Sequence, residues 1–208
     1  MSVDRAVEAV LWDADGVLQH LPAGWEASMR PAVGHLVDDV EGFLAAAFAA
    51  ERPCLTGHAR WVEVLPRLLE EWGIPEAFDD ALRVWLTIEP VEPARALAAK
   101  VRGRGVRCYL VTNQDEHRAR FMQRELGYDD LLDGAFYSCE LRAAKPDPAF
   151  FRAVLDRLGL APETVLFVDD NAASVDSARE LGLRAERWHV DHGVEALRDH
   201  LSRHGLDV

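Results

Sequence analysis

Short apolar runs that alternate with helical segments constrain the fold of this chain more than any other feature of its sequence. Each run is apolar and contains β-branched or aromatic residues, as buried strands do. The five runs cover residues 7–12, 106–112, 135–138, 164–168 and 183–188. Because proline suits a first helical turn and glycine a helix end, these residues bound the helical segments between the runs. The alternation predicts an α/β fold in which a parallel sheet carries helices on both faces.

Individual residues predict where several of these helices begin and end. Pro93 lies where a first turn would start, and Gly103 lies where that helix would end. Asn113 is expected to precede a second helix. Asp147, which is followed by proline, is expected to cap a third helix, and Gly159 would close it.

One segment interrupts the alternation. No convincing strand lies between the first run and Pro93, and four stretches there have a helical pattern: residues 25–40, 41–51, 58–72 and 75–86. Pro66 should kink the third of these helices or start it. We therefore predict a three-layer, Rossmann-like α/β core formed by residues 1–18 and 90–208. Residues 19–89 would form an inserted helical cap.

Composition limits the classes of protein that this chain can represent. Its 208 residues suit one domain with an insertion. The net charge of -13 opposes binding to nucleic acid or to an anionic membrane surface. Three scattered cysteines form neither a disulfide framework nor a zinc site. Without an apolar signal core or a membrane-length run, we expect a soluble cytoplasmic protein; its oligomeric state cannot be deduced from the sequence.

Polar residues follow four of the predicted strands, close to the point where each strand ends. The carboxyl ends of parallel strands meet at one edge of a sheet, and ligands bind there. We therefore expect one site with four carboxylates, a hydroxyl and an ammonium group, built from Asp13, Asp15, Thr112, Asn113, Lys145, Asp169 and Asp170. The polar tail around Asp191-His192 and from His200 to His204 is instead expected at the surface.

Electrostatics indicates what this site would bind. Two carboxylates 4 Å apart repel by about 4 kcal/mol at an effective dielectric constant of 20, so four cannot all stay ionised beside one lysine. Either some bind protons or a divalent cation lies among them. Oxygen ligands without clustered histidine or cysteine favour Mg²⁺ over zinc. Asp13 and Asp15 lie two residues apart, so one could attack while the other donates or accepts a proton.

The same residues resemble the four motifs of the haloacid dehalogenase superfamily, in order and across residues 7–182. The matching segments are Asp13-Ala14-Asp15-Gly16-Val17, Thr112-Asn113, Lys145-Pro146 and Asp169-Asp170. The helical insertion is similar to the small cap of the first cap class of that family. The sequence around the last two motifs looks most like the branch that contains sugar-phosphate phosphatases and the phosphatase domain of soluble epoxide hydrolases.

This resemblance implies a role for each motif residue. Asp13 would be the nucleophile that forms an aspartyl-phosphate. Asp15 would be the general acid and then the base, and its backbone carbonyl would bind Mg²⁺. Thr112, helped by the backbone of Asn113, would hold a phosphoryl oxygen, and Lys145 would join the nucleophile to the phosphoryl group.

The last motif implies the remaining metal ligands. Asp170 would bind Mg²⁺ directly, together with Asp13, and Asp169 would lie beside the metal and orient water or Lys145. Many relatives carry Asp or Asn four residues after the metal aspartate, whereas this chain has Ser174. We therefore expect weaker metal affinity rather than loss of function.

These observations predict a Mg²⁺-dependent phosphoric monoester hydrolase that acts on a small phosphorylated metabolite, such as a sugar phosphate. The substrate itself cannot be deduced from the sequence. His20, which closely follows the first motif, and Arg60 of the insertion are candidate substrate contacts. Trp25, Trp61 and Trp85 of the insertion are expected in the core, where an aromatic ring could also line a substrate pocket.

Three alternatives remain at this point. A haloacid dehalogenase also uses an aspartate nucleophile but needs no metal, and Asp15 argues against it, because halide displacement needs no leaving-group acid. A response-regulator receiver gathers carboxylates, Thr and Lys around Mg²⁺, but its paired acids end the first strand and no cap is inserted there. The third alternative is a purely structural role or a binding role without catalysis. Nothing at the motif positions suggests it.

Overall fold

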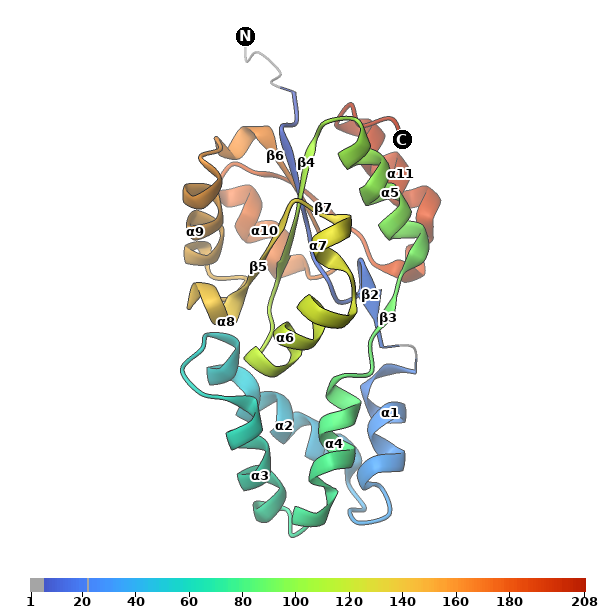
Figure 1. The fold of residues 1–208 in the computed structure, drawn as a ribbon, viewed down its shortest axis with the longest axis vertical. Helices are drawn as coiled ribbons and strands as arrows, with labels where there is room; N and C mark the ends of the chain where they lie inside the picture. The colour runs from blue at the N-terminus through green and yellow to red at the C-terminus, as the bar shows by residue number, and fades with distance from the viewer. Residues whose placement is uncertain (1–5, 22) are drawn as a thin grey trace.

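A parallel sheet of five strands, in the order β5-β4-β1-β6-β7, lies at the centre of the protein (Figure 1). The computed structural model describes residues 6–21 and 23–208. All five predicted strands are present, and the α/β fold class is confirmed. The strands are β1 (Ala9–Trp12), β4 (Arg107–Thr112), β5 (Gly134–Tyr137), β6 (Val165–Asp169) and β7 (Arg184–Arg187).

The first strand occupies the middle of this sheet. Along β1, Leu11 is level with Tyr109 of β4 on one side and with Phe167 of β6 on the other. Every residue of β1 is buried, because strands pair with both of its edges and helices cover both faces. The residues that follow β1 therefore emerge at the centre of the carboxyl edge.

Helices cover the two faces unequally. One face packs against α5 (Glu92–Gly103), α6 (Glu116–Glu125), α7 (Tyr128–Leu131) and α11 (Val194–Arg203), and the other against α9 (Pro148–Leu158) and α10 (Ala172–Glu180). A short helix, α8 (Ser138–Leu141), follows β5, and two 3₁₀ turns flank the last two strands: η2 (Pro162–Thr164) and η3 (Val190–His192). None of the described helices combines the length and apolar character that a membrane span requires.

Most of the predicted helix boundaries are present. Pro93 lies in the first turn of α5, the Asp147 side chain accepts a hydrogen bond from the Ala149 N–H, and Gly159 ends α9 in the left-handed region. Asn113 precedes a helix, as predicted, although two residues separate it from the start of that helix. Helix α6 begins at Glu116 and is capped by Asp115, because the Asn113 amide is occupied elsewhere.

The segment after the first strand is helical, as expected. It forms α1 (Gly24–Val33), α2 (Val40–Leu55), α3 (Trp61–Glu71), the 3₁₀ turn η1 (Pro75–Ala77) and α4 (Phe78–Trp85). We call these elements the cap helices. They lie beyond the carboxyl edge of the sheet (Figure 1). Helix α1 ends at Val33, earlier than predicted. Asp39 caps α2, which begins at Val40, one residue before its predicted start, and runs past residue 51.

The cap helices bury an apolar cluster of their own, separate from the clusters on the two faces of the sheet. The indole rings of Trp61 and Trp85 stack at its centre, 4.6 Å apart. Pro66 lies within α3 rather than at its start, and Leu65 and Leu69 on this helix are fully buried. A cluster of this kind lets the segment fold as a unit over the sheet.

A two-stranded antiparallel ribbon joins the cap helices to the sheet. It pairs β2 (Gln19–His20) with β3 (Glu89–Pro90). Two-residue strands have no periodicity, so the sequence did not predict them. The predicted division, at residues 18/19 and 89/90, falls at this ribbon. The division of the chain into a core and a cap stays a prediction.

One buried acid lies between the cap helices and α6. Glu51 of α2 accepts a hydrogen bond of 3.0 Å from the indole N–H of Trp85. Burial and the neighbouring Asp115 raise the pKa of Glu51 to about 8 from an ordinary value of 4.5, although Arg118 opposes the shift. Glu51 therefore carries a proton in the folded protein at neutral pH.

Replacement of Glu51 by glutamine should remove a pH dependence of stability. Since the pKa is higher in the folded chain, folding takes up a proton, and the stabilisation is lost as the pH rises from about 4.5 toward 8. Relative to Glu51→Gln, the wild type should lose on the order of 1 kcal/mol per pH unit in this window. Urea denaturation at several pH values measures this difference.

The matched control is Glu41→Gln, which changes an exposed glutamate on the same helix. Its unfolding free energy should follow that of the wild type at every pH. Parallel curves for Glu51→Gln and the wild type would show that Glu51 does not titrate in this way.

Candidate active site

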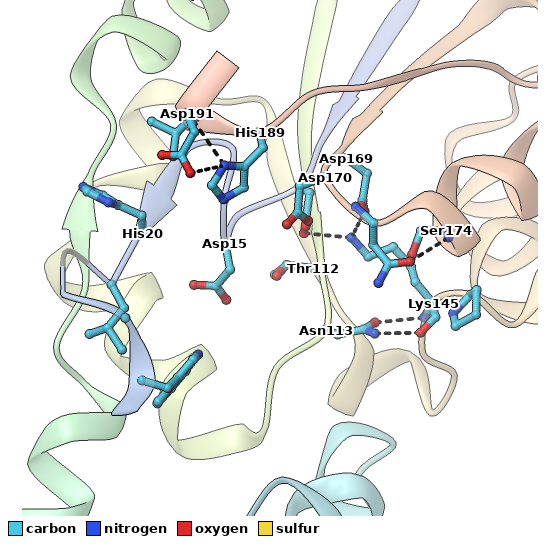
Figure 2. A pocket seen from close by; sticks show the side chains of 18 of the residues that line it. Asp15, His20, Thr112, Asn113, Lys145, Asp169, Asp170, Ser174, His189 and Asp191 are labelled. Carbon is cyan, nitrogen blue, oxygen red and sulfur yellow. Dashed lines mark hydrogen bonds and ion pairs between the residues drawn. The ribbon is translucent and has the colours of Figure 1, made fainter. Parts of the chain in front are cut away.

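The carboxyl ends of β1, β4, β6 and β7 meet at a cavity of about 680 Å³ on the edge of the sheet (Figure 2). Residues that follow β1, β4 and β6 face one another across it, and Lys145 reaches it from the loop after α8. Of the residues predicted for the site, the cavity lining includes Asp13, Asp15, His20, Thr112, Asn113, Lys145, Asp169 and Asp170.

Lys145 is the positively charged group that pairs with the carboxylates of this cavity. Its ammonium group lies 2.7 Å from Asp13 Oδ1 and 2.6 Å from Asp169 Oδ2, and it donates a third hydrogen bond of 3.0 Å to the Val111 carbonyl. The lysine side chain is only 3% exposed, and that of Asp169 only 1%. Three acceptors thus satisfy all three donors of a buried ammonium group.

Burial and crowding shift the pKa values of this cluster. Burial, and then the charge of Asp169, raise the pKa of Asp13 well above its ordinary value, although Lys145 opposes the shift. Burial by itself would lower the pKa of Lys145, but Asp13 and Asp169 outweigh it and raise that pKa. Burial and Asp169 also raise the pKa of Asp170. One lysine does not neutralise three carboxylates, so the cluster favours a proton or a cation.

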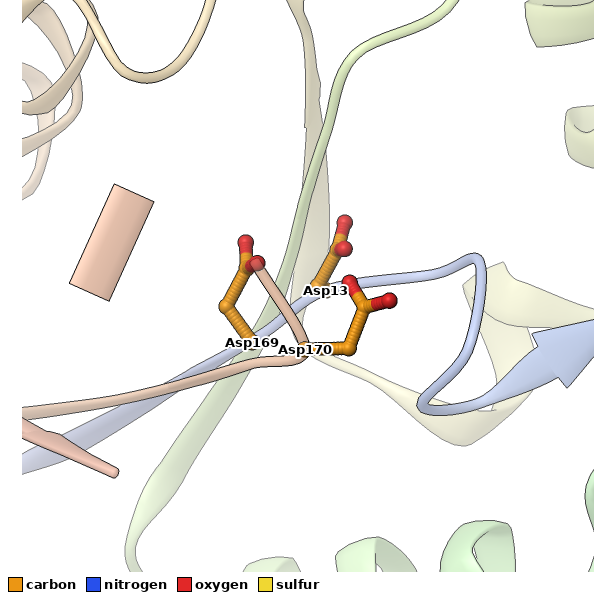
Figure 3. A group of neighbouring side chains, drawn as sticks. All are labelled: Asp13, Asp169 and Asp170. Carbon is orange, nitrogen blue, oxygen red and sulfur yellow. The ribbon is translucent and has the colours of Figure 1, made fainter. Parts of the chain in front are cut away.

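The donor set fits a hard divalent cation. Asp13, Asp169 and Asp170 each offer a carboxylate oxygen, and these oxygens lie within 4.8 Å of one another (Figure 3). Mg²⁺ prefers such all-oxygen sites and keeps several waters. Asp169 already uses one oxygen for Lys145 and accepts the Asn171 N–H with the other, so Asp13 and Asp170 have more capacity for a metal.

Thr112, the last residue of β4, and Asn113, which follows it, act in different ways. Thr112 is buried, and its hydroxyl accepts a hydrogen bond of 3.1 Å from the Gln114 amide. The Asn113 side chain makes two hydrogen bonds with the backbone of Lys145, donating to its carbonyl and accepting from its N–H. Asn113 thus holds the lysine loop in place, and only its backbone is left to contact a ligand.

Asp15 lies across the cavity from the lysine cluster and is held by three donors (Figure 2). Its Oδ1 accepts hydrogen bonds of 2.6 Å from Arg118 and 3.0 Å from Gln19, and its Oδ2 accepts one of 2.7 Å from Gln114. The side chain remains 44% exposed toward the cavity. No local sequence pattern indicates that these three donors contact Asp15.

The candidate substrate contacts of the insertion have different positions. His20, on β2, lines the cavity, and so does Trp25 at the start of α1. Arg60 does not reach the cavity: it lies exposed at the start of α3, where it pairs with Glu63 and Glu116. The indoles of Trp61 and Trp85 are buried among the cap helices.

The loop after β7 adds residues that the sequence analysis assigned to the surface or left out. Asp191 and His192 are exposed, as expected, yet His189 and Asp191 also line the cavity. The Val190 N–H donates to the Gly16 carbonyl, which joins this loop to the first motif. Ligands bind at the carboxyl ends of parallel strands, and these residues follow the end of β7. The same expectation would therefore have predicted them as site residues.

Gly16 keeps the first motif close to Asp170. Its φ of +79° lies in the left-handed region, and a Cβ there would meet Asp170 Oδ2 and His189 Cδ2 at 2.9 Å. Gly16→Ala should therefore displace Asp170. We expect Mg²⁺ affinity to fall by about 10- to 100-fold, which is the typical effect of mutating a residue that supports a metal ligand. Isothermal titration calorimetry measures that affinity directly.

Gly73→Ala is the matched control, because Gly73 has a φ of +71° but open space around its Cβ position. This variant should lose a similar amount of stability while its Mg²⁺ affinity is unchanged. Equal Mg²⁺ affinity in both variants would show that Gly16 does not support the metal site.

A family model described as haloacid dehalogenase-like hydrolase matches residues 7–182 of this chain. A phosphoglycolate phosphatase of Rhodospirillum rubrum is 36% identical to it over 197 residues, which cover 85% of this chain and 77% of that protein. A protein of Mycobacterium tuberculosis named as a phosphatase is 30% identical over 195 residues, or 86% of each chain.

The fold is shared with solved structures of lower identity. A haloacid dehalogenase family enzyme of Bacteroides thetaiotaomicron, solved with magnesium and inorganic phosphate, has a TM-score of 0.75 at 20% identity, covering 88% of this chain and 94% of its own. Dehalogenases also share this fold, so the fold alone does not choose between the two reactions. The match over residues 7–182 nevertheless assigns the family, and the chain belongs to the haloacid dehalogenase-like hydrolases.

Proposed function

We propose that this protein is a Mg²⁺-dependent phosphatase that hydrolyses a small phosphorylated metabolite through an aspartyl-phosphate on Asp13. The observation that carries the proposal is the pairing of Lys145 with Asp13 at 2.7 Å in a cavity that Asp15 also lines. This arrangement supports the roles of a nucleophile for Asp13, a cation that neutralises phosphoryl charge for Lys145 and a leaving-group acid for Asp15.

In the first step, an Asp13 oxygen attacks phosphorus and forms a P–O bond, while the bond from phosphorus to the ester oxygen breaks. Asp15, in its protonated form, donates a proton to that ester oxygen, so the product leaves as a neutral alcohol. The Lys145 ammonium, which is paired with Asp13, would neutralise charge on the phosphoryl group, and the Thr112 hydroxyl would donate a hydrogen bond to a phosphoryl oxygen.

In the second step, water attacks the phosphorus of the aspartyl-phosphate. The Asp15 carboxylate takes a proton from this water, the P–O bond to Asp13 breaks, and inorganic phosphate is released with Asp13 free again. Asp13 and Asp170, with the Asp15 carbonyl, are the residues that would hold Mg²⁺, and Asp169 would support them. When bound, the cation neutralises charge on the transferring phosphoryl group.

The cavity suits a small polar substrate. Its volume of about 680 Å³ lies in the range of small-molecule sites. Its wall also carries His20, His189 and Asp191, which can bond to hydroxyl groups, and Trp25, which offers an apolar surface. Curated relatives named for phosphoglycolate and for phosphorylated carbohydrates support a sugar phosphate or a similar metabolite as substrate.

Asp15 and the cap helices argue against the two alternative activities. A dehalogenase releases halide, which needs no proton, whereas Asp15 is held beside the cavity by three hydrogen-bond donors. A receiver module presents its acceptor aspartate to a partner protein, whereas here the cap helices lie beyond the carboxyl edge of the sheet (Figure 1). Both features favour the hydrolysis of a small ester.

Asp13→Asn should abolish turnover and leave the fold intact, because an amide has nearly the same shape but is a poor nucleophile. The rate of phosphate release from a panel of small phosphate esters should fall by more than about 10³-fold. Rapid acid quench of the wild type during turnover, followed by peptide mass spectrometry, should find a phosphoryl group on Asp13. Asp79→Asn, in an exposed acidic pair of α4, is the control and should keep full activity. Substantial turnover by Asp13→Asn would exclude the covalent mechanism.

Removal of Mg²⁺ by a chelator should stop phosphate release, and added Mg²⁺ should restore it. Ca²⁺ should compete with Mg²⁺ and inhibit, because it accepts bidentate carboxylates and would occupy the Asp13 oxygen that has to attack. Rate titrations with each metal measure both effects. A rate that is unchanged in chelator would overturn the metal site and favour the dehalogenase reaction, which a halide-release assay would then test.

A further inference from the structure

We propose that Arg118 is the positioning residue for Asp15: its guanidinium group fixes which carboxylate oxygen carries the proton and anchors that carboxylate to the cap helices. The inference rests on the proposed function, because it concerns the proton that Asp15 gives to the leaving group. No sequence motif points to Arg118, which lies on α6, 103 residues away from Asp15 in the chain.

The guanidinium group of Arg118 makes three different contacts. One terminal nitrogen donates to Asp15 Oδ1 at 2.6 Å, and the other donates to the Trp85 carbonyl at 3.1 Å. The group also lies over the indole ring of Trp25, 5.3 Å from its centre. The Arg118 side chain is 3% exposed. A fully buried cation therefore joins the first motif to α1 and to the end of α4.

The local structure holds this arginine rigidly. Asp115, which caps α6, accepts hydrogen bonds from the N–H groups of His117 and Arg118, so the backbone at the base of the side chain is fixed. Trp25 packs on one side of the guanidinium group. Among the described residues, Asp15 is the carboxylate that pairs with this cation. Since a buried charge is stable only when it is paired, the position of Arg118 and that of Asp15 depend on each other.

The contacts distinguish the two oxygens of Asp15. Oδ1 accepts from both Arg118 and Gln19, whereas Oδ2 accepts from Gln114 alone. Arginine stays protonated in proteins and cannot accept, so Oδ1 remains an acceptor throughout. A proton on Asp15 then belongs on Oδ2, which keeps a lone pair for the Gln114 donor. From Oδ2 the proton passes to the ester oxygen as the P–O bond breaks, and Oδ2 later takes a proton from the attacking water.

The same arginine also connects the acid to the wall of the substrate cavity. Trp25 lines the cavity, and its ring packs against the guanidinium group that binds Asp15. Lys145 and Asp13 lie at the other side and have no contact with Arg118. Loss of Arg118 should therefore impair proton transfer to the leaving group and spare the attack by Asp13.

Arg118→Met tests this separation, because methionine keeps much of the apolar stem and removes the donors. The rate on an alkyl phosphate, whose leaving group needs a proton, should fall by about 10²- to 10³-fold, within the range of general acid catalysis. The rate on p-nitrophenyl phosphate, whose leaving group needs none, should fall by less than about 5-fold. Arg120→Met, which alters an exposed arginine on the same helix, should change neither rate.

A double-mutant cycle shows whether Arg118 acts through Asp15. Asp15→Asn alone should reduce the alkyl phosphate rate strongly, and adding Arg118→Met should reduce it no further. Arg118→Lys should restore part of the lost rate, because an ammonium group can donate to Asp15 but cannot also bridge to Trp85. If Arg118→Met fails to fold, the alkyl-to-aryl rate ratio of Arg118→Lys provides the same test.

The outcomes separate this proposal from the proposed function. Equal losses on both esters, additive losses in the cycle, or an unchanged rate ratio in Arg118→Lys would overturn the role of Arg118 and assign it to the folded structure alone. If the wild type releases no phosphate from either ester in the presence of Mg²⁺, the proposed function itself fails.

Discussion

The charge balance around Lys145 is the constraint on which the rest of the site depends. A buried ammonium group needs all three of its donors satisfied, and here Asp13, Asp169 and the Val111 carbonyl meet that need. Removal of either carboxylate would leave a buried charge with too little compensation. The lysine thereby holds the ends of β1, β4 and β6 in one arrangement. Its charge is still too small for three carboxylates, and this deficit is what makes the cluster suited to a divalent cation.

The parallel sheet explains how such a cluster can exist at all. Strands β1, β4 and β6 are neighbours in the sheet but are separated by long stretches of chain, and their carboxyl ends point the same way. The polar residues are therefore delivered to one edge by strands whose interiors are wholly apolar. Asn113 adds a second level of support, since its amide holds the backbone of Lys145 and so fixes where the ammonium group lies.

The cap helices add what the sheet cannot provide. Their own apolar cluster lets them fold beyond the carboxyl edge, where Trp25 and the short ribbon strand with His20 form part of the cavity wall. Contacts between the cap helices and α6 are polar as well as apolar, and they include Trp85 and the buried Glu51. Through Arg118, these contacts reach the carboxylate of Asp15. The carboxylate of Asp15 is thus held by contacts that connect the end of β1, α6 and the cap helices.

The sequence by itself determined the strands, the fold class and the residues at the strand ends, because apolar periodicity and the residues that follow each run are local properties of the chain. Its expectation of a helical segment after the first strand was equally local. Other features depended on contacts between residues that lie far apart in the chain, at separations from 32 to 103 residues. Arg118 and Gln114 reach Asp15, the Asn113 amide is taken up by Lys145, and Arg60 pairs with acids outside the cavity. Only the tertiary structure decided these, since a side chain's partner depends on which distant segments pack beside it, and no local pattern records that.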